Sequence, residues 1–103
     1  MKKALTNDLK AMTKHVEKAA DLLKSIANTH RLMILCCLAG KELSVSELNA
    51  YVSLSQSALS QHLAYLREVN LVKTRRESQT IYYQLTGDEA IKIIQVLKSI
   101  YCP

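Results

Sequence analysis

The chain has 103 residues, the size of one small domain, so we expect a single domain over residues 1–103 with no room for a large catalytic cleft. Lys and Arg number 14 against 9 Asp and Glu, which favours an acidic partner such as nucleic acid or an anionic membrane surface. Two Gly, one Pro and no Phe or Trp argue against a sandwich or barrel and predict a mostly helical fold.

The apolar stretches fall short of the roughly 18 residues that span a bilayer, and no apolar region follows the two lysines near the N-terminus. We therefore expect a cytoplasmic protein with no membrane partner. Three cysteines, Cys36, Cys37 and Cys102, are too few and too unevenly placed for a secreted disulfide framework. They are expected to start as thiols in a reducing compartment.

The two ends of the chain predict amphipathic helices. In the first segment apolar residues recur at alternating spacings of four and three: Leu5, Leu9, Met12, Val16, Ala19 and Leu23. Residues 88–101 carry a broader apolar stripe behind a capping box formed by Thr86 to Glu89. Such stripes exceed what a small module can cover, so we expect a homodimer through the N- and C-terminal helices. The alternative is a monomer with both stripes folded inward.

The middle of the chain predicts a helix-turn-helix followed by a β-hairpin. Asn28 can cap a helix that Gly40 stops, a capping box from Ser44 to Glu47 starts a helix over 45 to about 51, and Ser55 caps the next helix. That helix buries Leu59, Leu63 and Leu66. Strands over 71–76 and 80–85, joined by a turn at 77–79, complete a winged helix-turn-helix. Similar helix pairs also occur in proteins that do not bind DNA.

The helix capped by Ser55 presents a polar face opposite its leucines, formed by Gln56, Ser57, Ser60 and Gln61. These side chains can hydrogen-bond base edges in the major groove of double-stranded DNA, although any surface helix needs a solvated face. A basic cluster follows and is expected to contact phosphates: Arg67, Lys73, Arg75 and Arg76.

The cysteines and histidines do not predict a metal or cofactor site. Cys36 and Cys37 point about 100° apart on a helix, and the three histidines lie on separate predicted helices. A ligand set assembled across helices stays open. Cys36 and Cys102 can meet if the last helix packs on the second, which predicts a redox-reactive thiol pair. The alternative is that these cysteines are small buried hydrophobes.

Two stretches resemble the arsenic-repressor (ArsR) family of bacterial winged-helix repressors: residues 27–32 (ANTHRL) and residues 55–63 (SQSALSQHL). The resemblance covers nearly the whole chain. Metal-sensing members carry a Cys-x-Cys pair where this chain has Ser44 and Ser46, so the resemblance implies that no soft metal site remains. The histidines that other members place on the last helix for zinc are also missing.

Cys36 and Cys102 resemble the thiol pair of the family's dithiol branch, the BigR, SqrR and HlyU group. The resemblance implies a dimeric repressor that binds operator DNA when reduced. Persulfides or related reactive sulfur species would bridge the two thiols and release the DNA. Cys37 departs from the two-thiol pattern, and we favour Cys36 because the match falls there.

Three further functions stay open at this point. The same branch allows a DNA-binding regulator that antagonises a nucleoid protein, with thiol oxidation only modulatory. A purely structural dimerisation module is disfavoured by the predicted wing. A thiol enzyme using Cys102 is disfavoured because the sequence shows no evident pair of a histidine and a carboxylate, so we expect no enzyme.

Overall fold

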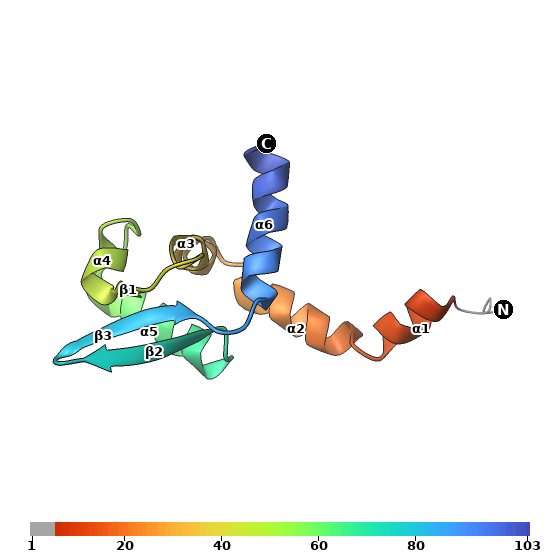
Figure 1. Cartoon of the computed structure of the whole chain (residues 1–103), viewed down its shortest axis with the longest axis horizontal. Coiled ribbons are helices and arrows are strands. Elements are labelled where there is room, and N and C mark those ends of the chain that lie inside the picture. Colours follow the sequence, from red (N-terminus) through yellow and green to blue (C-terminus); the bar gives the residue numbers. More distant parts are fainter. Residues whose placement is uncertain (1–5) are drawn as a thin grey trace.

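The computed structural model describes residues 6–103 as a helical body with a small sheet on one side and two N-terminal helices projecting from it (Figure 1). In chain order the elements are helices α1 (Asn7–Thr13), α2 (Val16–Ile26) and α3 (Thr29–Cys37), strand β1 (Leu43–Ser44), helices α4 (Val45–Asn49) and α5 (Gln56–Glu68), strands β2 (Val72–Glu77) and β3 (Thr80–Leu85), and helix α6 (Glu89–Tyr101). The predicted mostly helical fold with a β-hairpin is confirmed.

The prediction of one continuous N-terminal helix is wrong, because the chain breaks at His15 between α1 and α2. The Thr13 hydroxyl donates to the Leu9 carbonyl oxygen at 2.7 Å, a local bond that bends helices. The His15 N–H then donates to the Met12 carbonyl oxygen, three residues back, at 2.9 Å. None of the seven residues of α1 is buried, so no packing holds the segment straight. Leu5 lies outside the described residues.

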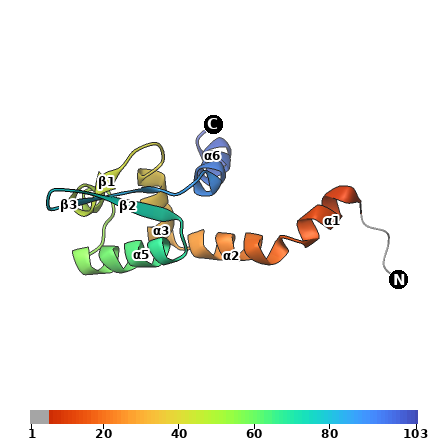
Figure 2. The same cartoon turned by 60° about the horizontal axis from the view of Figure 1, so that its bottom comes forward.

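The stripe of α1 and α2 is largely exposed, whereas α6 buries Ala90 and Ile94 in the core and exposes apolar side chains toward its end. Large apolar side chains of α1, α2 and α6 are between 50 and 78% exposed: Leu9, Met12, Val16, Leu23, Val96, Ile100 and Tyr101. The alternative of a monomer with both stripes folded inward is therefore wrong for the N-terminal stripe, while the C-terminal stripe is folded inward in part. The two N-terminal helices extend away from the body in both views (Figures 1 and 2).

The core lies where α3, α5, α6 and the sheet meet. Asn28 caps α3 as predicted, since its Oδ1 accepts the N–H groups of His30 and Arg31 at 3.0 and 3.1 Å. The predicted inner face of α5 is fully buried: Leu59, Leu63 and Leu66. Other buried side chains include Ile34 and Leu35 of α3, Leu48 of α4 and Ile94 of α6. This core fixes α5 against α3 and α6.

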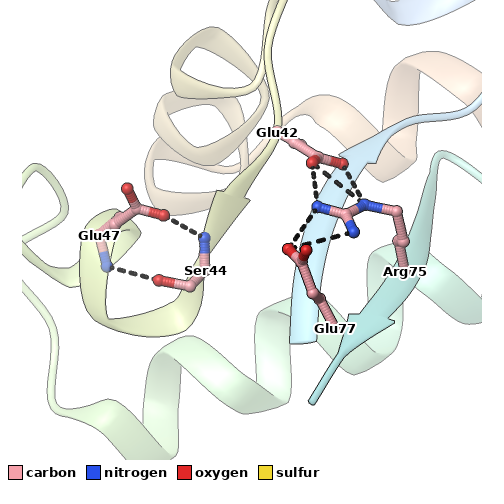
Figure 3. Close-up of polar contacts among 5 residues, drawn as sticks. All are labelled: Glu42, Ser44, Glu47, Arg75 and Glu77. Carbon is pink, nitrogen blue, oxygen red and sulfur yellow. Dashed lines mark hydrogen bonds and ion pairs between the residues drawn. The ribbon is translucent and has the colours of Figure 1, made fainter. Parts of the chain in front are cut away.

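The helix-turn-helix forms from the predicted caps. Ser44 Oγ accepts the Glu47 N–H at 3.2 Å, and Glu47 Oε1 accepts the Ser44 N–H at 2.9 Å, which completes the capping box (Figure 3). Helix α4 ends at Asn49, two residues before the predicted end. The Asn49 amide donates to the carbonyl oxygens of Val52 and Leu54 at 3.3 and 2.8 Å, and so holds the connection to α5.

The sheet has the order β1-β3-β2 and is antiparallel throughout. Strand β3 matches its predicted bounds, while β2 is shifted by one residue and pairs from Val72 opposite Leu85 to Glu77 opposite Thr80. Strand β1 was not predicted, because two residues are too few for an alternating pattern. The short strand connects the hairpin to α4.

A Schellman motif turns the chain from α5 into β2. The Leu71 N–H donates to the Leu66 carbonyl oxygen at 2.9 Å, and the Asn70 N–H donates to the Arg67 carbonyl oxygen at 3.1 Å. Asn70 has a φ of 66°, in the left-handed region that this motif requires. The side chains of Leu66 and Leu71 are both buried. The end of α5 therefore sets the direction in which the chain enters the wing, the hairpin of β2 and β3.

The predicted capping box from Thr86 to Glu89 does not form, because Asp88 is the N-cap of α6. The Thr86 N–H donates to the Leu71 carbonyl oxygen at 2.9 Å, so Thr86 continues the β3 backbone. Its hydroxyl is buried without a hydrogen-bond partner in the described part of the chain. Gly87 follows with a φ of 60° and turns the chain into the helix.

Candidate nucleic-acid interface and thiol pocket

Helix α5 exposes its four predicted polar residues together. Gln56, Ser57, Ser60 and Gln61 lie within the first two turns, away from the buried leucines, and all four are exposed. A glutamine amide can donate and accept at once, which matches adenine in the major groove, and serine can pair with several base edges. The face is therefore suited to direct reading of bases.

The predicted basic residues continue from the end of α5 into the wing. Arg67 lies in the last turn of α5, and Lys73 and Arg76 lie in β2; all three are exposed. Alternation along the strand directs Lys73 and Arg76 to opposite faces of the sheet. These long cationic side chains can neutralise phosphates on both sides of the wing.

Arg75, the fourth predicted phosphate contact, is held by two carboxylates (Figure 3). Its Nε lies 3.1 and 3.2 Å from the two carboxylate oxygens of Glu42, its Nη2 also bonds Glu42, and Glu77 Oε2 lies 3.4 Å from Nη1. The guanidinium lies 4.9 Å from the centre of the Tyr82 ring. The hydrogen bond with Arg75 holds the pKa of Glu42 below its usual value. The same bond raises the pKa of Arg75.

A polar cluster joins α5 to α2 and α3. Arg31 Nε donates to the Ser25 carbonyl oxygen at 2.7 Å, and the guanidinium lies 4.5 Å from the centre of the Tyr65 ring. The Tyr65 hydroxyl donates to Ser25 Oγ at 3.3 Å. Because Tyr65 belongs to α5, these contacts connect α5 to α2 and α3. We refer to Ser25, Arg31 and Tyr65 as the α2–α3–α5 cluster.

His62 is partly buried on α5 and faces His30 of α3, with 5.9 Å between the ring centres. Burial lowers the pKa of His62, and the positive charge of Arg31 and the neighbouring His30 lower it further. His62 is therefore a packing residue between α3 and α5.

Cys36 and Cys102 line one small apolar cavity between α3 and α6, the thiol pocket. Its volume is about 230 Å³, and its walls are Leu32, Cys36, Ile94, Leu97, Lys98, Tyr101 and Cys102. Cys36 is half-buried and Cys102 is exposed. Burial raises the pKa of the Cys36 thiol, Lys98 partly offsets this, and Cys102 raises it again. Cys102 is thus the more accessible thiol and Cys36 the more protected one.

Cys37 does not line the thiol pocket and packs beside the core. Burial raises the pKa of its thiol, the neighbouring Cys36 adds to this, and Lys41 opposes it. Among residues 6–103, no group of three or more His, Cys, Asp or Glu side chains is arranged to hold a metal ion. Within the same residues, no helix is long and apolar enough to cross a membrane.

Comparison with known proteins identifies the family. Residues 28–74 match the model of the bacterial regulatory proteins of the arsR family. The chain is 52% identical over 95 residues to the transcriptional activator HlyU of Vibrio cholerae, covering 92% of this chain and 88% of the relative. It is 46% identical to the biofilm growth-associated repressor of Agrobacterium fabrum, covering 91% and 80%. The chain belongs to the arsR family.

A solved structure agrees with this assignment. The transcriptional repressor BigR from Xylella fastidiosa superposes with a TM-score of 0.87 at 37% identity, covering 96% of this chain and 99% of that one. The winged helix-turn-helix prediction is confirmed by this match. This arsR-family chain is accordingly a transcriptional regulator and not an enzyme.

Sequence reasoning on this arsR-family chain missed the residues that hold its site in place. Glu42 and Tyr82 hold Arg75, while Arg31, Tyr65 and Asn49 orient α5. The only local signal was for Asn49, since an asparagine at the end of a short helix is typical of a turn. The other contacts join residues more than 30 positions apart or lie across the sheet, where periodicity gives no signal.

Proposed function

We propose that this arsR-family regulator is a homodimeric repressor whose two thiols control its binding to operator DNA. In the reduced state it binds double-stranded operator DNA. Persulfides or related reactive sulfur species bridge Cys36 and Cys102 and release the DNA. The observation that carries the proposal is that both thiols line the same small pocket between α3 and α6.

DNA is read by α5 and positioned by basic residues around it. Gln56, Ser57, Ser60 and Gln61 contact base edges in the major groove, since they are exposed together on one face. Arg67, Lys73 and Arg76 contact phosphates and so make the binding steeply salt-dependent, the more so in a dimer.

The sulfur chemistry begins at the exposed thiol. The Cys102 thiolate attacks the outer sulfur of glutathione persulfide, which gives a Cys102 persulfide and glutathione. The Cys36 thiol then attacks the inner sulfur, forming a disulfide with Cys102 and releasing hydrogen sulfide. If both cysteines are persulfidated first, they condense to a trisulfide and again release hydrogen sulfide. Each step exchanges sulfur–sulfur bonds, so no further oxidant is needed.

The resting separation of the thiols can decide which oxidant acts. A direct disulfide needs Cα atoms within roughly 7 Å, whereas each inserted sulfur lengthens the bridge. Thiols held beyond that reach would form a bridge only through inserted sulfur, which would favour persulfides over peroxides as the inducer.

The bridge reaches the DNA through α3. Bridging ties α6 to α3, and the α2–α3–α5 cluster ties α3 to the base-reading helix. Because α6 also carries exposed apolar residues of the dimer seam, the bridge changes the spacing of the two α5 helices in the dimer. Half-sites lie about one DNA turn apart, so a small change in spacing lowers affinity.

The experiment compares cysteine variants on a labelled duplex that the wild-type protein selects from a random-sequence pool. Glutathione persulfide should release the wild-type protein, whereas Cys36→Ser and Cys102→Ser should bind normally when reduced and ignore the persulfide. Cys37→Ser is the matched control and should respond like wild type. A responsive Cys36→Ser together with an unresponsive Cys37→Ser would reject the assignment of the pair.

The Vibrio cholerae relative is a transcriptional activator, and this favours a second candidate function. In this function the chain antagonises a nucleoid protein on DNA and thiol oxidation only modulates its affinity. Footprinting on DNA coated with a nucleoid protein separates the two: displacement of the nucleoid protein by the reduced chain supports this candidate, and stable co-occupancy rejects it.

A further inference from the structure

The ion pair between Glu42 and Arg75 crosses the sheet. Arg75 lies in β2, and Glu42 immediately precedes β1, on the other side of the central strand β3. The pair therefore reaches over β3, where Tyr82 is the residue opposite Arg75 and packs against its guanidinium. Glu42 also lies two residues before Ser44, the cap of α4. Figure 3 shows the contact of Glu42 with Arg75 and the capping box of Ser44 with Glu47, which start from the same short segment.

This arrangement uses the geometry that only arginine provides. Two nitrogens of the guanidinium face both oxygens of Glu42, and Glu77 faces the remaining edge. Two carboxylates around one cation leave a local net charge of −1, which repels a phosphate. Arg75 is therefore poorly placed to contact DNA directly.

We propose that Glu42 and Arg75 form a clasp that positions the wing against the helix-turn-helix for DNA binding. In this role Glu42 is a positioning residue, and the phosphate contacts belong to Lys73 and Arg76 of the same strand. The β1–β3 ladder joins only two residue pairs, whereas β2 and β3 pair over six, so the clasp adds a side-chain connection between the hairpin and the segment that leads into α4. The proposal rests on the DNA-binding function proposed above.

The clasp and a direct phosphate contact by Arg75 make opposite predictions for conservative variants. Arg75→Lys keeps the charge but loses the two-pronged pairing, so a clasp predicts about fivefold weaker binding, as weak as Arg75→Ala. Glu42→Gln should weaken binding similarly. Exchanging the pair, Glu42→Arg with Arg75→Glu, should recover part of the lost affinity, since the ion pair is kept while Glu77 then lies beside a second carboxylate.

The measurement is fluorescence anisotropy with the duplex selected by the wild-type protein. Glu17→Ala on the exposed side of α2 controls for the loss of one negative charge. Circular dichroism and urea midpoints should stay close to wild type in all variants, because exposed ion pairs add little stability.

Two results would overturn the clasp alone: Glu42→Gln binding as tightly as wild type or more tightly, or Arg75→Lys binding like wild type while the exchanged pair recovers none of the lost affinity. Either would mean that Arg75 contacts the phosphate itself or contributes nothing. A wild-type protein that enriches no sequence from the pool would overturn the DNA-binding function and the clasp together.

Discussion

Three asparagines hold the junctions that orient α5 and the wing. Asn28 caps α3, Asn49 holds the turn between α4 and α5, and Asn70 ends α5 in a left-handed conformation. In each case one short amide or one unusual backbone angle satisfies groups that a helix end leaves unpaired. The positions of α5 and the wing therefore depend on a few residues outside the core.

The left-handed conformation of Asn70 is a testable source of strain. Asn tolerates this region and Gly adopts it freely, whereas Ala places a Cβ against the backbone. We expect Asn70→Ala to lower the free energy of unfolding by about 1 kcal/mol relative to Asn70→Gly. Urea denaturation measures both. Equal stability of the two variants would contradict the role of Asn70 in ending α5.

The lowered pKa of His62 predicts a loss of stability in mild acid. Between the ordinary pKa of histidine, about 6.5, and the lower value in the fold, the unfolded chain binds more protons than the folded one. The free energy of unfolding should therefore fall as the pH drops below about 6.5.

The comparison that isolates this effect uses His62→Gln, which cannot titrate. When the pH is lowered from about 7.5 to about 5.5, the urea midpoint should fall more for the wild-type protein than for the variant. Equal falls would show that His62 does not contribute to the pH dependence.

At the scale of elements, helix starts were predictable wherever their signals were local. The caps at Asn28, Ser44 and Ser55 each act within three residues of the same helix, so the sequence was sufficient. The cap predicted at Thr86 failed because its N–H bonds Leu71, fifteen positions earlier, across the end of the sheet. The predicted continuous N-terminal helix failed for the converse reason. Helix α1 buries no residue, so no packing selects one continuous helix over two.

The candidate site divides in the same way. The exposed face of α5 follows from helical periodicity and the exposed cations of β2 from composition, so both were predictable. The partner of Arg75 was not, because Glu42 lies 33 residues earlier and meets it only across β3. Its charge in the sequence predicted that Arg75 contacts a phosphate, whereas in the fold two carboxylates surround it.

The division of labour between α5 and the wing gives a prediction. Gln61→Ala should reduce the preference for the selected duplex over random DNA, because a base contact contributes about 1–3 kcal/mol of discrimination. Arg76→Ala should weaken binding to both duplexes and reduce the salt slope by about one. Anisotropy titrations across salt concentrations measure both quantities. The reverse pattern would reject α5 as the base-reading helix.

At the scale of the whole molecule, the exposed stripes of α2 and α6 define the proposed dimer seam. Leu23 is 56% exposed and Ile100 59%, and both are large apolar side chains. We expect Leu23→Glu to convert the dimer into a monomer with unchanged helix content, because a carboxylate in the seam would be desolvated without a partner. Sedimentation and circular dichroism measure the outcome. A variant that stays dimeric would place the seam elsewhere.

The proposed function depends on a link, through the thiol pocket, between that seam and α5. The most direct test is one sample of wild-type protein, titrated with its selected duplex before and after glutathione persulfide, with intact mass and peptide mapping on the same material. We predict a sulfur bridge between Cys36 and Cys102 together with a large loss of affinity. A complete bridge between these residues with unchanged affinity would contradict the account.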